Sequence, residues 1–419
     1  METTITLIIN LIILLKNLPI VMDTRNLWTL AAMIALLMKG KHARLYELAR
    51  ALPCDGELES RAQKLRRWVS NSAITPIDML PAFLELLAPV RSQLPEIVLI
   101  IDRTAWTRLG IHINLFLCSI AFNGRSFPVF WLLLPTRGCS TLAEQQAVLN
   151  PVLTALAAHP LLSTLPITVL ADREFCSPLL PQWLKKHGIH WAIRVKKSFY
   201  VSRSDFPALL ISRFLERCQR GEYYLYLNVL LTDEHRIAMN LLICWHPDCD
   251  GPIAIITDLD EAVTVTARYQ QRPWIETLNR DVKSSGFDLE KGKMTDSTRL
   301  KNLLIPIAFA YILLVMQRYT EELDDPPPQL TKGQTDEGFP PPPPTPPRTH
   351  SLFTQARNRI IDLLERKPLP IVCQFFDQFF DFLTTLLSRQ IEDTPRKLFS
   401  NYAKQKRLLL KGSHSSVRY

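Results

Sequence analysis

Clusters of cysteine are missing from this 419-residue sequence. Its eight cysteines are scattered through apolar or mixed segments, as expected of reduced, buried thiols in a cytosolic protein. The one tight pair, Cys244 and Cys249 with His246 between them, has no second Cys/His pair at ligand spacing, which argues against a zinc site. With 47% hydrophobic residues, the chain can bury a sizeable core without disulfides, and wholesale disorder is excluded. The length predicts several domains.

A membrane-spanning run is also missing near the N-terminus. The stretch from Ile5 to Leu15 is apolar, but it is too short to span a bilayer and Lys16 interrupts it. No basic region precedes it, as a signal peptide would require. We therefore predict a core helix at this position, no membrane partner and a cytoplasmic location.

Acidic residues are absent after Asp393, and this absence creates a basic tail. The chain has 49 Lys and Arg against 40 Asp and Glu, a net charge of +9. The tail supplies seven of the excess cations, and a second basic stretch runs from Lys39 to Arg67. Clustered positive charge suits a polyanion, because each neutralised phosphate releases condensed counterions. The alternative is a basic surface that only keeps the protein in solution.

Residues 1–92 read as helical, and we interpret them as a DNA-binding domain. We expect helices at 28–37 and 43–52 and, after the break at Pro53–Gly56, a basic amphipathic helix at 59–68. Two short helices separated by a break, the second one basic, resemble a helix-turn-helix. The same pattern occurs in helical subdomains that do not bind DNA.

The hydrophobic pattern changes at residue 93, and residues 93–198 predict an α/β core. We expect strands at 96–102, 111–122, 127–134, 166–172 and 190–196, with helices at 141–158, broken or restarted at Asn150-Pro151, and at 179–187. This order is that of an RNase H-like fold with a mixed five-stranded sheet. Its first and fourth strands lie side by side in parallel, so Asp102 and Asp172, which end those two runs, would be brought together.

The remaining segments are predicted from their patterns alone. In residues 199–262, apolar segments rich in β-branched and aromatic residues predict an antiparallel β insertion. Residues 263–323 again have a helical pattern and are predicted to be helices of the core. Residues 324–350 hold a run of prolines from Pro340 to Pro344 and form an extended linker. Residues 351–419 read as a helical pair, at 352–365 and 371–387, followed by the basic tail.

The segment from Tyr269 to Lys283 carries the chemistry. On an ideal helix, Tyr269, Arg272, Glu276 and Lys283 share one face, although Pro273 suits a first helical turn and would leave Tyr269 and Arg272 in the loop before it. Asp102, Asp172 and Glu276 would form an all-oxygen site without His or Cys, which selects Mg²⁺ or Mn²⁺.

Three further carboxylates are assigned no role. Asp281 lies about 140° around the helix from Glu276, so we expect it to be solvated. Asp288 and Glu290 follow Gly286 in a loop.

These motifs resemble the DDE transposases of the YREK group, which belong to the insertion-sequence-four superfamily. Asp102, Asp172 followed by Arg-Glu-Phe, and the pattern Tyr-x2-Arg-x3-Glu-x6-Lys match the signature at its spacing. The match covers residues 25–320, and the β insertion is also a trait of the family.

The resemblance implies a bacterial or archaeal enzyme that hydrolyses DNA strands at the ends of an element. It then joins the freed 3′-hydroxyl to target DNA, with Asp102, Asp172 and Glu276 holding two Mg²⁺ ions, or Mn²⁺ in their place. Tyr269, Arg272 and Lys283 would hold phosphates near the cleaved end.

Further DNA contacts are also implied, with Arg194 and Lys196 as candidates for the DNA backbone. The partners would be double-stranded DNA, as terminal inverted repeats and target, and a second copy in a dimer assembled on that DNA. Hairpin-forming members stack a flipped base on a tryptophan of the insertion, whereas the matching strand here, Pro252–Thr257, has none.

Two other functions stay open from the sequence. One is a related or domesticated nuclease that cuts DNA but does not integrate it. The other is a non-catalytic DNA-binding protein that acts as a repressor.

Overall fold

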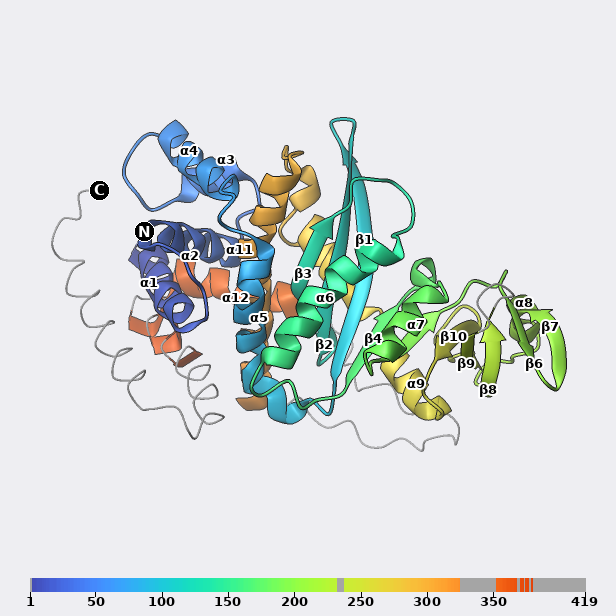
Figure 1. Cartoon of the computed structure of the whole chain (residues 1–419). Coiled ribbons are helices and arrows are strands. Elements are labelled where there is room, and N and C mark those ends of the chain that lie inside the picture. Colours follow the sequence, from blue (N-terminus) through green and yellow to red (C-terminus); the bar gives the residue numbers. More distant parts are fainter. Residues whose placement is uncertain are drawn as a thin grey trace.

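A single mixed sheet runs through the molecule in this computed structural model, which describes residues 2–231, 237–324, 352–367, 370–372, 374–376 and 378–379. The sheet has ten strands in the order β3-β2-β1-β4-β5-β10-β9-β8-β6-β7 (Figure 1). The strands are β1 Ile97–Arg108, β2 Ile111–Phe122, β3 Arg125–Leu133, β4 Ile167–Ala171, β5 His190–Arg194, β6 Tyr200–Arg203, β7 Phe206–Leu210, β8 Tyr223–Leu231, β9 Ile237–Cys244 and β10 Ile253–Thr257.

The first five strands have the predicted RNase H-like arrangement. β2 pairs antiparallel with both β1 and β3, whereas β4 pairs in parallel with β1 and with β5. The runs of apolar residues in β1 and β4 are buried because helices cover both faces of this half of the sheet. The predicted α/β fold class is therefore confirmed.

One predicted boundary in the core is wrong. β1 does not end at Asp102 but continues to Arg108, where a two-residue turn leads into β2. Up to Asp102, every residue of β1 is buried. After Asp102 the residues are half-buried or exposed, because β4 ends at Ala171 and no longer flanks β1. Beyond Asp102 the two strands form a hairpin that projects from the sheet (Figure 1).

The predicted antiparallel insertion is present as β6–β10, and it extends the core sheet. β10 pairs antiparallel with β5 and with β9, so the insertion begins where the core strands end. β9, β8, β6 and β7 follow in antiparallel order.

Helices surround the five core strands and form most of the N-terminal region. They are α1 Glu2–Asn17, α2 Thr24–Met38, α3 Leu45–Ala51, α4 Leu58–Val69, α5 Pro76–Leu87, α6 Leu142–Ala158, α7 Leu179–Lys186, α8 Ile211–Leu215, α9 Ala262–Tyr269, α10 Trp274–Arg280, α11 Ser297–Asp324 and α12 Leu352–Arg366. A π-helical turn, Asp281–Ser285, continues α10. α6 runs without a break through Pro151, contrary to the predicted restart, because its buried residues pack on either side of the proline.

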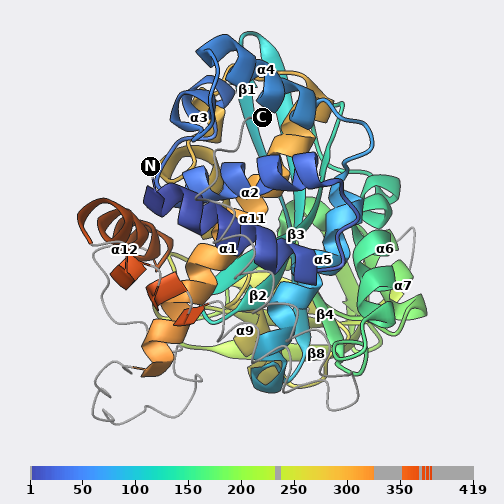
Figure 2. The same cartoon turned by 90° about the vertical axis from the view of Figure 1, so that its left-hand side faces the viewer.

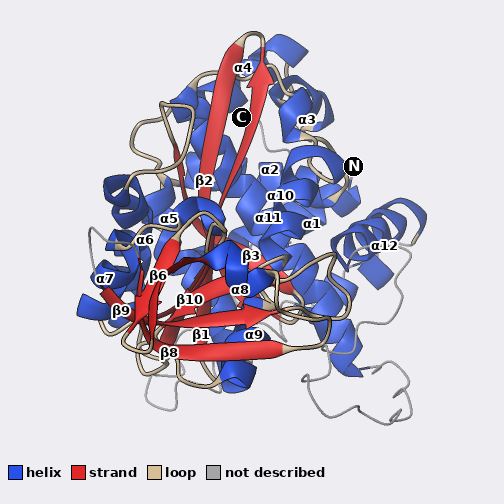
Figure 3. Cartoon of the chain, turned by 90° about the vertical axis from the view of Figure 1, so that its right-hand side faces the viewer, coloured by secondary structure: helices blue, strands red, loops and turns tan. Residues whose placement is uncertain are grey.

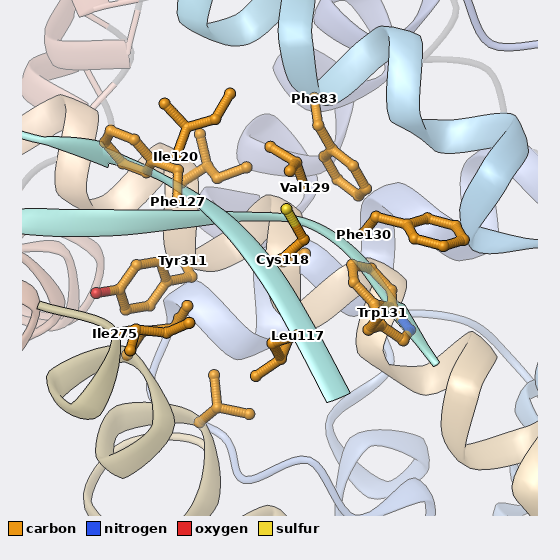
Figure 4. Packing of buried hydrophobic residues seen from close by; sticks show 14 of the residues in the cluster. Phe83, Leu117, Cys118, Ile120, Phe127, Val129, Phe130, Trp131, Ile275 and Tyr311 are labelled. Atoms are coloured by element: carbon orange, nitrogen blue, oxygen red, sulfur yellow. The ribbon is translucent and has the colours of Figure 1, made fainter. Parts of the chain in front are cut away.

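The core lies between the helices and β1–β3. α11 is its central helix and packs against α2, α12 and β3, while α1 lies along α2 (Figure 2). Phe83 of α5 contacts both Trp131 of β3 and Phe309 of α11. Figure 4 shows Phe83, Trp131 and their buried neighbours from close by. α1 is the predicted core helix, with Leu7, Leu11 and Leu15 fully buried.

By length and composition alone, α11 could cross a membrane. An 18-residue window within Ser297–Tyr319 has a mean hydropathy of 1.7, yet 94% of that window is buried inside the fold, as in the core helix of a globular domain. The predicted proline linker, most of the second C-terminal helix and the basic tail fall largely outside the described residues.

Candidate active site

Backbone register brings Asp102 and Asp172 together. The parallel pairing of β1 with β4 ends at Ile101 opposite Ala171, so the next residues along both strands are Asp102 and Asp172. Asp172 caps a short 3₁₀ turn, Arg173–Phe175. The predicted adjacency therefore holds, although only Asp172 follows the end of a strand.

Glu276 reaches the same place from the first turn of α10. α9 ends at Tyr269 and α10 begins at Trp274, so the segment Tyr269–Lys283 is two helices joined by a turn. Of the two predicted arrangements, the one with Arg272 before the helix is correct, because Pro273 occupies the N-cap of α10. Tyr269 is not in that loop; it ends the preceding helix.

Arg272 is the centre of the site and contacts all three carboxylates. Its guanidinium lies 3.0 Å from Asp102 Oδ1 and 3.6 Å from Asp172 Oδ2, and it also donates to Glu276 Oε1. The Arg272 side chain is only 11% exposed, whereas that of Glu276 is 58% exposed. Burial acts to lower the pKa of Arg272, but the carboxylates outweigh it and the pKa is raised. The guanidinium thus stays charged and neutralises part of the acidic cluster.

Asp102 has a second partner, which sequence analysis did not predict. Asn279 Nδ2 donates to Asp102 Oδ2 at 2.8 Å, and its position three residues after Glu276 puts both side chains on the same side of α10. Burial raises the pKa of Asp102 to about 6, against the opposing effect of Arg272. The i, i+3 spacing was the signal that could have identified Asn279.

A second ion pair, also not predicted, connects β1 with the turn that follows Asp172. Arg103 Nε donates to Glu174 Oε1 at 2.7 Å and Arg103 Nη2 to Glu174 Oε2 at 3.0 Å. Each of these residues lies one or two positions after a site aspartate. The two-pronged pair therefore fixes the chain that follows Asp172 against β1.

Lys283 and Tyr269 flank the carboxylates without joining them. Lys283 lies in the π-helical turn, donates to the Ala105 carbonyl at 3.1 Å and lies 6.0 Å from the Trp106 ring. Tyr269 is buried, and burial raises the pKa of its phenol. Both therefore lie beside the cluster, Lys283 along β1 and Tyr269 behind Arg272.

The other two predicted contacts lie further from the centre. Arg194 is the last residue of β5 and is half-buried, and Lys196 follows it in the loop beside Cys176.

The prediction that Asp281 is solvated is wrong. Asp281 is 2% exposed, and it lies near Arg125, Arg280 and Arg357. Asp281 has α-helical backbone angles, so it lies on the side of α10 opposite Glu276 as expected. That side, which also carries the buried Leu278, faces the core rather than solvent.

Asp288 and Glu290 lie in the predicted loop, but Asp288 has a structural role there. It adopts a left-handed backbone conformation with φ 56° and forms an ion pair with Arg44, so it ties this loop to the N-terminal region. Glu290 lies 3.9 Å from Lys283.

The donor atoms at the site fit a hard divalent cation. Three carboxylates supply only oxygen, and Asp172 Oδ1 is buried without a hydrogen-bond partner. In the part of the chain that is described, however, no three His, Cys, Asp or Glu side chains converge closely enough to hold a metal ion as they stand. Arg272 contacts all three carboxylates.

Comparison with known proteins identifies the family of this chain. No curated protein matches the chain. One similar solved structure is the cryo-EM structure of a piggyBac transposase synaptic complex with hairpin DNA, which is 11% identical, with a TM-score of 0.40, over 92% of this chain and 76% of that one. A family model described as the transposase DDE domain matches residues 93–313, which is more than half of the chain and contains all three site carboxylates. The chain therefore belongs to the family of transposases with a DDE domain.

Proposed function

We propose that the chain is a transposase of the YREK group that cleaves DNA at the ends of an insertion sequence and joins the freed 3′-hydroxyl to target DNA. The observation that carries this proposal is the meeting of Asp102, Asp172 and Glu276 around one guanidinium. Three carboxylates on two neighbouring strands and a helix suit phosphodiester chemistry, which needs clustered oxygen ligands rather than a side-chain nucleophile.

Asp102, Asp172 and Glu276 would hold the metal ions. When bound, Mg²⁺ or Mn²⁺ would activate water or a 3′-hydroxyl and stabilise the leaving oxygen. Asn279 keeps Asp102 oriented through its 2.8 Å hydrogen bond. Glu276 is the most exposed of the three, so it can adjust its position when DNA arrives.

The cations around the site would hold the phosphates of the DNA. Arg272 is the only one in contact with the carboxylates among the described residues, and its planar fork suits a phosphate as well as a carboxylate. Lys283 is two-thirds or more buried along β1 and offers a point charge on the far side of Asp102. Arg194 and Lys196 extend the same charge along the insertion.

The test is cleavage of DNA that flanks the gene, with Mg²⁺ present. We expect Glu276→Gln to lower the nicking rate by at least about 100-fold, which is the upper range for losing a residue that only supports a metal ligand. Glu216→Gln, at an exposed residue that directly follows α8, is the matched control and should cut normally. Retained cleavage in Glu276→Gln would contradict the assignment.

A second measurement separates the proposal from its rivals. A DNA end that is already cleaved should be joined to a target plasmid by the wild-type protein. Cleavage without joining indicates a nuclease, whereas binding of terminal DNA without nicking under Mn²⁺ indicates a repressor.

A further inference from the structure

The β1–β2 hairpin reaches well beyond the carboxylates. After the pair Asp102 with Leu117, the two strands continue through six more pairs to Arg108 with Ile111. At about 3.4 Å per residue, the tip of the hairpin lies about 20 Å from Asp102. Figure 3 shows this ribbon projecting at the same end of the molecule as α4, the basic helix of the N-terminal region.

The tip of the hairpin exposes apolar side chains between basic ones. Leu109 is 70% exposed and Ile111 is 48% exposed, and both are among the large hydrophobic residues that face solvent. Arg108 and His112 flank them, and no acidic residue occurs between Arg103 and Asn114. Such a surface suits a ligand that combines negative charges, which the basic side chains can bind, with apolar faces, which the exposed apolar side chains can contact.

The turn at the tip is built on an unfavourable residue. Leu109 has φ 49° and Gly110 has φ 77°, so both residues are left-handed. The β2–β3 turn has nearly the same geometry, with φ 42° at Asn123 and 75° at Gly124, but uses asparagine, which tolerates it. Leucine disfavours this left-handed conformation, so the backbone geometry of the turn does not explain why Leu109 is there. Since its side chain is mostly exposed, packing within the described residues does not explain it either.

One face of the ribbon leads from the carboxylates to the tip. Alternate residues of a strand share a face, so Trp106 and Arg108 lie on the same side of β1 as Asp102. Lys283 lies beside Trp106 on this face, at 6.0 Å from the ring. A duplex held at Asp102 can therefore follow a row of aromatic and cationic groups towards Leu109.

We propose that the tip of the β1–β2 hairpin is a DNA wedge, in which Leu109 inserts into a groove of the bound duplex and unstacks a base step. This inference rests on the proposed function, since it takes the substrate to be duplex DNA bound at Asp102. Apolar wedges with basic flanks unstack base steps in this way. A reach of about 20 Å corresponds to about six base-pair steps from the cleaved phosphodiester bond.

The variant Leu109→Asn tests the wedge without endangering the fold. Asparagine favours the left-handed turn, so the melting temperature should stay the same or rise. The probe is duplex DNA from the flanks of the gene with 2-aminopurine at successive positions, bound in EDTA so that no cleavage occurs. Wild-type protein should raise the fluorescence about four to eight steps from the cleavage point, and Leu109→Asn should abolish the rise.

A cleavage assay gives an independent readout. Leu109→Asn should cut a fully paired duplex at least about tenfold more slowly than wild type, and an abasic site at the unstacked step should restore most of the rate. The control is Leu227→Asn, the same substitution at another exposed leucine, on β8, which should change neither readout.

The outcomes distinguish this inference from the proposed function. If Leu109→Asn and wild type give the same fluorescence and cut equally fast, the wedge is wrong while the transposase proposal stands. If Leu109→Asn changes only the self-association of the protein without DNA, the tip is a protein interface and the wedge is again wrong. Loss of cleavage by Glu276→Gln tests the transposase proposal separately, because it does not depend on the tip.

Discussion

The guanidinium of Arg272 connects three carboxylates that approach it from two strands and a helix. An arginine in this position lowers the repulsion among the acids, and Asp102 depends on it most because it is the most buried of the three. Buried ion pairs contribute little to stability by themselves, but breaking one leaves an uncompensated charge.

Removing this arginine should therefore destabilise the protein in a pH-dependent way. For Arg272→Met we expect the free energy of unfolding to fall by about 3 kcal/mol at pH 8. The pKa of Asp102 is about 6, so at pH 5 the carboxyl is mostly protonated and the loss should be smaller. Urea denaturation at both pH values measures this. Adding Asp102→Asn to the variant should recover most of the stability at pH 8, and a loss that does not depend on pH would contradict the argument.

Some site residues could be predicted from the sequence because their signals are local. Asp102 and Asp172 each follow an apolar run, and Arg272 and Glu276 keep a fixed spacing. Asn279 could have been identified from its spacing to Glu276, but its partner Asp102 could not, because that residue lies far away in sequence. The pair Arg103–Glu174 could not be predicted for the same reason. Asp281 was placed incorrectly because the helical angle tells which residues share a side of α10 but not which side faces the core.

At the scale of elements, α12 holds the turn that carries Lys283. Arg357 of α12 donates to the Gly286 carbonyl at 2.8 Å and to the Gly40 carbonyl at 2.6 Å. Phe353 is fully buried and packs on Phe287 and Tyr311. A side chain at Gly286 would meet Phe353 within 2.5 Å, so the close packing of α12 requires glycine there. The C-terminal region is thus joined to the helix that bears Glu276.

Breaking this contact should weaken both the fold and the site. We expect Arg357→Met to lower the free energy of unfolding by about 3 kcal/mol, since two hydrogen bonds from a charged group are lost. The cleavage rate should also fall, because the π-helical turn loses its support.

The control is Arg366→Met on the same helix, whose side chain is 80% exposed and pairs with Asp362; it should cost no more than about 0.5 kcal/mol. Equal effects of the two variants would mean that α12 does not support the turn. The helix itself was predictable from its amphipathic pattern, whereas its docking site was not, because a proline-rich segment outside the described residues separates it from the rest in sequence.

At the scale of the whole molecule, the ten strands make the core and the insertion one structural unit. Ile256 of β10 is fully buried and pairs with Ile193 of β5 and Leu241 of β9, so it joins the two halves of the sheet. The five core strands and the antiparallel character of the insertion were predictable from local periodicity. The continuity of the sheet was not, since no local pattern tells which strand β10 will pair with.

This continuity predicts one cooperative unfolding transition. Ile256→Ala should lower the free energy of unfolding by about 2–5 kcal/mol and shift the whole transition, followed by circular dichroism and by tryptophan fluorescence. Two separate transitions, of which only one moves, would show that the insertion folds independently.

The pairing of β5 with β10 has a consequence for the history of such chains. The chain leaves the core after Arg194 of β5, and the last strand of the insertion, β10, returns beside it with Ile255 opposite Arg194, so the two ends of the insertion are neighbours in the sheet. A loop between adjacent points can grow or shrink without displacing its ends, and the entropic cost rises only slowly with length. A segment of different length between β5 and β10 would therefore leave Asp102, Asp172 and Glu276 in place, so this junction can accept an added domain without disturbing the carboxylates.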